Sequence, residues 1–284
     1  MPSDYTDDLR LAHLLADDAD SISSDRFKAM DLHVMTKPDL TPVSDADQAV
    51  EESIRRTLSK ARSRDAITGE ESGSSGTSAR RWIVDPIDGT KNYVRGVPVW
   101  ATLIALAVED EVVMSVVSAP LLGRRWWATK DQGSWTGKSL MKATRNQVSD
   151  VRRLEDASLA YASLHGWEER DRFDDFLALM RRCWRTRGYG DFWSYMLLAE
   201  GAVDLAAEPE LELYDMAALV PIVTEAGGTF TSLDGVEGPW GGNALASNTH
   251  LHDAALSFLG SVPDGDDPDW PSHGPGSVTP FRRT

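Results

Sequence analysis

The chain has 284 residues, of which 41% are hydrophobic, and this is enough for a substantial core in one large domain or two smaller ones. A formal net charge of −16 argues against nucleic acids and anionic membranes as partners, because like charges repel. No apolar run approaches the ~20 residues of a membrane helix, and the N-terminus lacks the basic start and apolar segment of a signal peptide. We therefore expect a globular, cytoplasmic protein without a membrane partner. The single cysteine, Cys183, excludes an internal disulfide and is expected to be a buried or half-buried thiol.

Two helices are predicted at the start of the chain. Residues 4–34 carry apolar side chains at an approximately helical spacing, which predicts one long amphipathic helix, with a break near 21–24 left open. Ser44 then offers the N-cap of a second helix, and Asp47 falls in the first turn of that helix. A carboxylate there complements the helix dipole, so Asp47 has a structural explanation as well as a functional one.

A short strand is predicted at 66–69, and it runs directly into Glu70 and Glu71. Adjacent acids are usually solvated, but these two stand at a strand end, before a segment rich in glycine and serine. That segment, residues 72–78, is a candidate lid, because mobile loops that close over sites have this composition.

The apolar run 82–84 predicts a second buried strand, and two carboxylates, Asp85 and Asp88, emerge where it stops. Pro86 lies between them and cannot donate a ladder hydrogen bond, so the strand is expected to end there. The bend at Pro86 can aim both carboxylates at one point.

The same motif continues with Gly89 and Thr90. Gly89 tolerates a positive φ and lets an anion approach backbone N–H groups, while Thr90 adds a hydroxyl that can orient a water. Carboxylates that converge beside free N–H donors suit Mg²⁺ holding a phosphate, because Mg²⁺ often shares its oxygen ligands with substrate phosphate. By itself, the stretch 85–90 fits an ordinary turn about equally well.

A β-rich block follows at 99–119. Its apolar runs 101–108 and 112–117 flank a polar stretch and predict a long hairpin, and further strands are expected at 126–129 and 133–136. We expect this half of the chain to form an antiparallel sheet covered by the first two helices.

The second half alternates strands and helices. His250 and His252 suggest a metal pair, although capping and turn chemistry at a helix start explains them more simply. Residues 261–284, which are rich in Pro, Gly, Asp and Ser, are predicted to be a disordered tail. The predicted elements are a strand at 159–162, a helix at 171–184, a turn at 187–191, a helix at 192–200 capped by Gly201, a strand at 203–207, a helix at 214–226, a strand at 245–247 and a helix at 250–259.

Four acids stand at element ends: Glu70, Asp85, Asp88 and Asp215. The order Gly-Glu-Glu, Asp-Pro-Ile-Asp-Gly-Thr and a late aromatic-Asp-x-Ala-Ala resembles the inositol monophosphatase superfamily of Mg²⁺-dependent, Li⁺-sensitive phosphatases. Several motifs in the family's order are far more specific than any one of them. The resemblance implies an α+β fold, a layered αβαβα sandwich, that is usually dimeric. It also implies a single phosphatase domain over 1–260, with sub-halves of about 1–150 and 151–260.

The resemblance further implies a site for two Mg²⁺ ions, with a third, weaker ion held through Glu70. Glu70, Asp85 and the backbone carbonyl of Ile87 would hold the first ion, and Asp85 would bridge to a second. The remaining roles that it implies are Asp88 and Asp215 as ligands of the second ion, Thr90 paired with Asp47 to orient and help deprotonate the attacking water, and the N–H groups of Gly89 and Thr90 as donors to phosphate oxygens.

The substrate is harder to predict. Inositol-specific members have small residues where Asp191 stands, whereas the segment 187–191 resembles the histidinol-phosphate phosphatase branch, which acts in histidine biosynthesis. An extra carboxylate suits the ammonium group of histidinol phosphate. Glu208 matches a position that contacts the non-phosphate end of the substrate in relatives, so it would complete an acidic pocket with Asp191. Two alternatives remain open: Asp191 as a helix N-cap, and Arg187 as a phosphate ligand or a partner of a surface acid.

The resemblance thus predicts an Mg²⁺-dependent phosphomonoesterase that releases L-histidinol and phosphate from L-histidinol phosphate. One alternative is an inositol-1-phosphate or broad sugar-phosphate phosphatase with the same metal site. Another is a scaffold of this fold that binds metal without catalysis, although a scaffold has no chemical need to keep every ligand.

Overall fold

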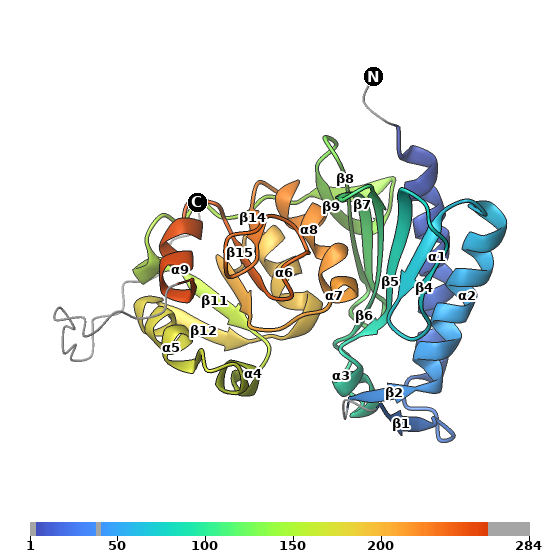
Figure 1. Cartoon of the computed structure of the whole chain (residues 1–284), viewed down its shortest axis with the longest axis horizontal. Helices are drawn as coiled ribbons and strands as arrows, with labels where there is room; N and C mark the ends of the chain where they lie inside the picture. Colours follow the sequence, from blue (N-terminus) through green and yellow to red (C-terminus); the bar gives the residue numbers. More distant parts are fainter. Residues whose placement is uncertain (1–3, 38–40, 261–284) are drawn as a thin grey trace.

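The computed structural model describes residues 4–37 and 41–260, so the tail predicted at 261–284 lies outside the described residues. Helices and sheets alternate in five layers along the long axis of the molecule (Figure 1). The predicted αβαβα sandwich is therefore confirmed.

The first layer consists of two helices, α1 (Thr6–Arg26) and α2 (Asp45–Ala61), on one face of an eight-stranded sheet (Figure 1). Leu15 of α1 and Ile54 of α2 join one buried cluster with Trp82 of the sheet. Burying large apolar side chains stabilises this packing by about 1.5–3 kcal/mol each. The predicted N-cap of α2 is confirmed, because the hydroxyl of Ser44 accepts the N–H of Ala46 at 3.3 Å.

The first helix is shorter than the sequence pattern predicts. It ends at Arg26 because Phe27 is extended and Lys28 adopts a left-handed φ of 61°. Instead of continuing the helix, β1 (Val34–Thr36) pairs with β2 (Pro42–Ser44) in an antiparallel ribbon. Apolar spacing alone could not reveal this break, since both sides of it carry apolar residues.

The large sheet has the order β10-β9-β8-β7-β6-β5-β3-β4. The predicted hairpin and the strand at 66–69 are confirmed. The expectation of an all-antiparallel sheet is wrong at one place, because β3 and β5 pair in parallel. Its strands are β3 (Ala66–Gly69), β4 (Gly73–Ser75), β5 (Arg80–Asp88), β6 (Ala101–Val108), β7 (Glu111–Ala119), β8 (Arg124–Thr129), β9 (Ser134–Ser139) and β10 (Lys142–Arg145), and the short helix α3 (Thr90–Val94) follows β5.

The candidate lid is also corrected by the structure. Within residues 72–78, Gly73–Ser75 form the edge strand β4, which pairs antiparallel with β3. Ladder hydrogen bonds hold this segment against the sheet, so it is a tight hairpin arm and not a loop that closes over a site.

Helices α6, α7 and α8 fill the space between the large sheet and a second, five-stranded sheet (Figure 1). Three helices, α4, α5 and α9, cover the far face of that second sheet. Its order is β12-β11-β13-β15-β14, with parallel pairing at β12-β11-β13 and antiparallel pairing elsewhere. The bounds are β11 (Ser158–Tyr161), α4 (Leu164–Glu169), α5 (Phe173–Arg182), β12 (Arg185–Gly188), α6 (Asp191–Ala199), β13 (Leu205–Glu208), α7 (Leu213–Ala217), α8 (Leu219–Thr224), β14 (Thr229–Thr231), β15 (Ala244–Ser247) and α9 (His252–Leu259).

Two predicted helices have other bounds in the structure, and one of them is divided. The helix predicted at 171–184 begins only at Phe173, and α4 precedes it, because Asp171 adopts a left-handed φ of 55°. The helix predicted at 214–226 divides after Ala217, because Pro221 lacks the N–H that a continuous helix would need. The turn predicted at 187–191 is likewise partly strand, and β14 was not predicted.

Among the described residues, every helix is too short or too polar to traverse a lipid bilayer.

Candidate active site

Parallel pairing of β3 and β5 places Glu70 and Asp85 side by side. Gly69 is opposite Val84 in the register, and the N–H of Glu70 donates to the carbonyl of Val84 at 3.2 Å. Because both strands run in the same direction, the residue after each of these positions emerges at the same edge of the sheet. Two segments that are 15 residues apart thus present adjacent carboxylates (85 − 70 = 15).

The Asp85–Thr90 segment has a different backbone from the one predicted. β5 does not end at Pro86 but continues to Asp88, with an irregular register between Asp85 and Asp88. Pro86 is tolerated because the ladder is interrupted there. The N–H of Ile87 donates to Asp85 Oδ1 at 3.0 Å, so Asp85 folds back onto its own bend.

Gly89 is required for the turn that follows. Its φ is 86°, and a Cβ at this position would lie 3.2 Å from Asp191 Oδ2 and 3.2 Å from the carbonyl oxygen of Val99. The predicted positive φ is therefore confirmed. Without a side chain, Gly89 lets the second half of the molecule approach the motif closely.

Three carboxylates converge at this edge: Asp85, Asp88 and Asp215 each offer an oxygen, and these atoms all lie within 4.8 Å of one another. Burial, followed by the charge of Glu70, raises the pKa of Asp85 well above its usual value. Burial, followed by the charge of Asp191, does the same for the pKa of Asp88. Buried carboxylates at this separation repel one another, and a divalent cation bound between them would remove that repulsion. The oxygen-only donor set fits a hard cation such as Mg²⁺.

Asp215 is held by the first turn of α7, as predicted. Its Oδ2 accepts the N–H of Glu212 at 2.8 Å, which forms part of a capping box. Burial raises its pKa to about 7, and the Glu212 N–H opposes that rise. The cap fixes the side chain while one oxygen stays available to the cluster.

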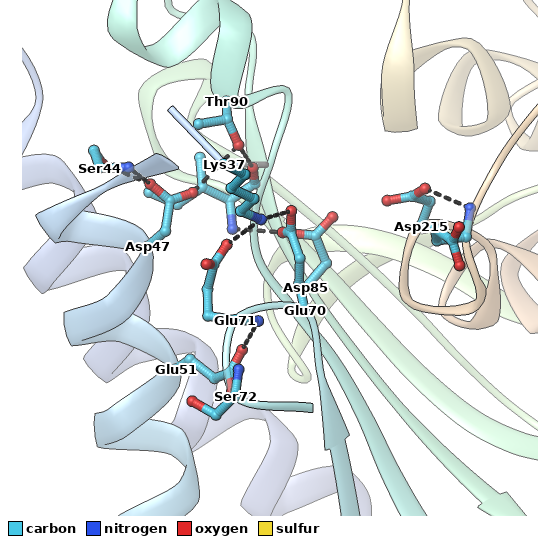
Figure 2. Close-up of polar contacts among 12 residues, drawn as sticks. Lys37, Ser44, Asp47, Glu51, Glu70, Glu71, Ser72, Asp85, Thr90 and Asp215 are labelled. Carbon is cyan, nitrogen blue, oxygen red and sulfur yellow. Dashed lines mark hydrogen bonds and ion pairs between the residues drawn. The ribbon is translucent and has the colours of Figure 1, made fainter. Parts of the chain in front are cut away.

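Asp47 and Thr90 are also in contact. Thr90 Oγ1 lies 3.2 Å from Asp47 Oδ1 and 2.9 Å from the carbonyl oxygen of Ile87 (Figure 2). The other oxygen of Asp47 accepts the N–H and the hydroxyl of Ser44 at 2.8 and 2.6 Å. Asp47 is thus fixed in a capping box at the start of α2, and it offers only Oδ1 to Thr90.

Lys37 was not predicted as a site residue. Its Nζ lies 2.7 Å from Glu70 Oε1 and 2.7 Å from Glu71 Oε1 (Figure 2). The pKa of Glu70 is raised, chiefly by burial, although the ion pair with Lys37 opposes this. The ammonium group therefore supplies the positive charge beside Glu70 in this structure. A lysine in a polar connecting segment gives no sequence signal for this role.

Asp191 joins the two halves of the molecule at the site. The N-cap of α6 is Gly190, so the N-cap interpretation of Asp191 is wrong; Asp191 is the first helical residue and has a strained φ of 46°. Its Oδ2 accepts the amide of Asn92 at 3.2 Å. The N–H of Phe192 is satisfied instead by Asp88 Oδ2 at 2.7 Å, across the interface between the two halves.

Glu208 ends β13 and is only 6% exposed. Within the part of the chain that the structure describes, its Oε1 and the hydroxyl of Tyr195 have no hydrogen-bond partner. Burial, followed by the charge of Asp191, raises the pKa of Glu208 well above its usual value. Buried polar atoms without partners are costly, so this carboxyl is a candidate contact for a bound polar group.

The remaining candidates are Arg187, the two histidines and Cys183, and none of them belongs to the cluster of Asp85, Asp88 and Asp215. Arg187 is exposed on β12, where its Nη1 donates to the carbonyl of Thr186 at 2.7 Å, and its contact with phosphate stays a prediction. His250 pairs with Asp150 at 3.0 Å. The histidines do not form a metal pair: His252 lies between the hydroxyls of Thr231 and Ser247, at 2.9 and 3.0 Å. Cys183 is half-buried, as predicted, and burial raises the pKa of its thiol to about 12.

Comparison with known proteins agrees with this geometry. The model of the inositol monophosphatase family matches residues 6–259. A histidinol-phosphatase of Streptomyces coelicolor is 65% identical over 260 residues, which cover 90% of this chain and 98% of that protein. One from Mycobacterium tuberculosis is 54% identical over 254 residues, with 89% and 98% covered. The solved structure of an inositol monophosphatase from Zymomonas mobilis has a TM-score of 0.80 at 34% identity and covers 90% of this chain and 99% of that one. Since the family model spans almost all of the described residues, the chain belongs to the inositol monophosphatase family.

Proposed function

We propose that this protein is an Mg²⁺-dependent histidinol-phosphatase, which hydrolyses L-histidinol phosphate to L-histidinol and phosphate in histidine biosynthesis. The observation that carries the proposal is the second acidic group, Asp191 and Glu208, beside the three converging carboxylates. An inositol phosphate offers no cation to these two acids, whereas histidinol phosphate carries an ammonium group. The similarity to two histidinol-phosphatases over about nine-tenths of the chain supports the same choice.

We assign the metal ligands as follows. Glu70, Asp85 and the carbonyl of Ile87 would hold one Mg²⁺, and Asp85 would be shared with a second that Asp88 and Asp215 would also hold. A third, weaker ion would be held through Glu70, and Li⁺ is expected to inhibit. When bound, these cations offset the charge of the phosphate dianion and make water acidic enough to attack at neutral pH. Lys37 now pairs with Glu70 Oε1 at 2.7 Å, and its positive charge would compete with a cation held by Glu70.

The protein's own groups orient the attacking water. The hydroxyl of Thr90 can donate its hydrogen to Asp47 Oδ1 and accept one from the water, so a proton can pass from the water through Thr90 to Asp47. The two hydrogen bonds from Ser44 hold the Asp47 carboxylate in the orientation that this transfer needs. The N–H groups of Gly89 and Thr90 hold phosphate oxygens during the attack.

Thr90→Val should lower kcat for L-histidinol phosphate by about 10²-fold with little change in KM, because it removes a proton carrier and not a binding group. The measurement is steady-state phosphate release at saturating Mg²⁺. Thr57→Val on the half-exposed side of α2 is the matched control. Equal loss in both variants, or a change confined to KM, would reject the role of Thr90.

Asp191 and Glu208 form the pocket for the amine or imidazole end of the substrate. The amide of Asn92 holds the Asp191 carboxylate in place, and the unpartnered Oε1 of Glu208 gains a hydrogen-bond donor when a cationic ligand enters. Arg187 stays a proposed further contact to the substrate phosphate.

Asp191→Asn should reduce kcat/KM for L-histidinol phosphate by about 10- to 100-fold, because a buried charge-assisted hydrogen bond is worth about 1.5–3 kcal/mol. The change keeps an oxygen that can accept the Asn92 amide, so hydrolysis of a phosphate ester without a cationic group, such as 4-nitrophenyl phosphate, should fall less than threefold. The two substrates are compared on one enzyme preparation. A similar loss on both would mean that Asp191 supports the site in general and does not select the cation.

The principal test of the function compares kcat/KM for L-histidinol phosphate and inositol 1-phosphate and asks whether the gene restores growth of a histidine auxotroph. Preference for inositol phosphate or a broad range of sugar phosphates would reject the substrate. No Mg²⁺-stimulated phosphate release from any phosphomonoester would instead indicate a non-catalytic scaffold.

We also propose that the enzyme is a cytoplasmic homodimer and that residues 1–260 act as a single domain of two sub-halves.

A further inference from the structure

Glu51 is a buried acid that the proposed mechanism does not use. It lies in the middle of α2 and is 1% exposed. Its Oε2 accepts the N–H of Glu71 at 2.7 Å, and its Oε1 accepts the N–H of Ser72 at 3.0 Å (Figure 2). These are the two peptide groups immediately after Glu70, so the carboxylate of Glu51 holds the backbone that carries a proposed metal ligand.

We propose that Glu51 is a positioning residue that sets the place of the Glu70 carboxylate and thereby the affinity of the site for Mg²⁺. This inference rests on the proposed metal site. Glu51 does not touch the ion or the substrate; it acts through the backbone of 70–72. An outer group that fixes a ligand typically changes metal affinity 10- to 100-fold when it is lost.

Gly69 shows how closely the backbone fits around this carboxylate. A Cβ at Gly69 would lie 2.5 Å from Glu51 Cδ and 2.6 Å from each of its oxygens, which is far inside van der Waals contact. The glycine thus lets the strand end pass directly over the carboxylate. With Gly69 before Glu70 and two held N–H groups after it, the main chain at Glu70 has little freedom left.

Arg55 offsets the charge of Glu51 and adds hydrogen bonds to the same segment of the chain. Arg55 Nε donates to Glu51 Oε1 at 2.7 Å, one turn further along α2. The rest of its guanidinium donates to Ser75 Oγ at 3.1 Å and to the carbonyl of Gly73. The pair therefore clamps the whole Glu71–Ser75 arm onto the helix, which agrees with the absence of lid character at β4.

Asp47 and Glu51 are four residues apart on the same face of α2 (51 − 47 = 4). Asp47 contacts Thr90, which orients the water, and Glu51 holds the segment after Glu70. One rigid helix therefore fixes the relative position of the water-orienting group and of a metal ligand. A purely structural role for Glu51 would affect stability alone and would not change Mg²⁺ affinity in the folded protein.

The test is Glu51→Gln, with Glu52→Gln at the exposed neighbouring position as the matched control. The introduced amide would place an NH₂ group against one of the two N–H donors, so one of them loses its acceptor. Two quantities are measured without substrate: the Kd for Mg²⁺ by titration calorimetry of the folded full-length protein, and amide hydrogen exchange of the peptide covering 69–75 in metal-free protein. We expect the Kd to rise at least about tenfold and the exchange of that peptide to accelerate, with neither change in the control.

Gly69→Ala tests the same contact from the other side and serves alone if Glu51→Gln does not fold. The added methyl should displace the Glu51 carboxylate and raise the Kd for Mg²⁺ by a comparable factor. Because the methyl acts through Glu51, the effects of Glu51→Ala and Gly69→Ala should be less than additive in the double variant. Unchanged Mg²⁺ affinity in folded Glu51→Gln or Gly69→Ala, or wild-type protein that binds no Mg²⁺, overturns the positioning role. Wild-type protein that binds Mg²⁺ without hydrolysing L-histidinol phosphate rejects only the proposed substrate.

Discussion

Asp85→Asn should lower kcat/KM for L-histidinol phosphate by at least about 10³-fold, the largest effect expected of any single substitution. Asp85 is the carboxylate shared between the two proposed cations, and it is nearly fully buried at 2% exposure. An amide can still accept the N–H of Ile87, which now donates to Asp85 Oδ1 at 3.0 Å, so the backbone bend should survive. The substitution therefore removes charge with little change in shape.

The melting temperature of the variant distinguishes this loss of activity from misfolding. Metal-free Asp85→Asn should melt at a higher temperature than metal-free wild type, because one of the mutually repelling carboxylates becomes neutral. Added Mg²⁺ should then raise the melting temperature of the variant much less than that of wild type. Asp234→Asn on the exposed surface is the control and should change neither activity nor the response to Mg²⁺. A variant that keeps more than a tenth of wild-type activity would contradict the bridging role of Asp85.

The second large effect is a dependence of metal stabilisation on pH. Burial raises the pKa of Asp215 from 3.8 to about 7, and the pKa values of Asp85 and Asp88 are raised as well. A carboxyl whose pKa is higher in the folded than in the unfolded protein holds its proton more tightly when folded. The contribution of these carboxyls to the stability of the metal-free protein is thus greatest below their unfolded pKa and falls as the pH rises towards 7, by about 1.4 kcal/mol per pH unit for each proton concerned.

Mg²⁺ should reverse this loss, since it binds the ionised carboxylates. Saturating Mg²⁺ should raise the melting temperature by about 5–10 °C at pH 8 and by less than about 2 °C at pH 5, where protons compete with the metal. The comparison is made with and without Mg²⁺ at each pH, against NaCl of equal ionic strength. The difference in melting temperature with and without Mg²⁺ removes the effect of groups that titrate regardless of metal. One such group is His13, whose pKa is lowered to about 4, chiefly by burial, and which destabilises the fold in acid. An equal effect of Mg²⁺ at both pH values would exclude the carboxylate cluster as the metal site.

Local sequence patterns located most elements but not their interruptions. The strand Ala66–Gly69, the hairpin of β6 and β7 and the start of α2 follow from short apolar runs and a capping serine. The end of α1 and the start of α5 depend on left-handed residues, Lys28 and Asp171. Neither residue type requires that conformation, so the pattern gives no sign of it.

Local sequence patterns also did not reveal the residues that position the site, because these residues act on partners far away in the sequence. Glu51, Lys37 and Asn92 act on Glu70, Glu71 and Asp191, which are close in space and up to 99 residues away in sequence (191 − 92 = 99). The sequence indicated the role of Glu51 only through its position one turn after Asp47 on the same helix face. A glutamate at such a position is equally typical of an exposed helix surface.

The sequence by itself determined the chemistry of the site, because Asp-Pro-Ile-Asp-Gly-Thr, Gly-Glu-Glu and Tyr-Asp-x-Ala-Ala each carry side chains whose reactivity depends on residue type. Only the tertiary structure decided how these segments meet. The parallel pairing of β3 with β5, the contact of Asp88 with the start of α6 and the grip of α2 on the segment after Glu70 are long-range interactions. Their free energy comes from burial and hydrogen bonding between distant segments, and no local preference of the chain encodes it.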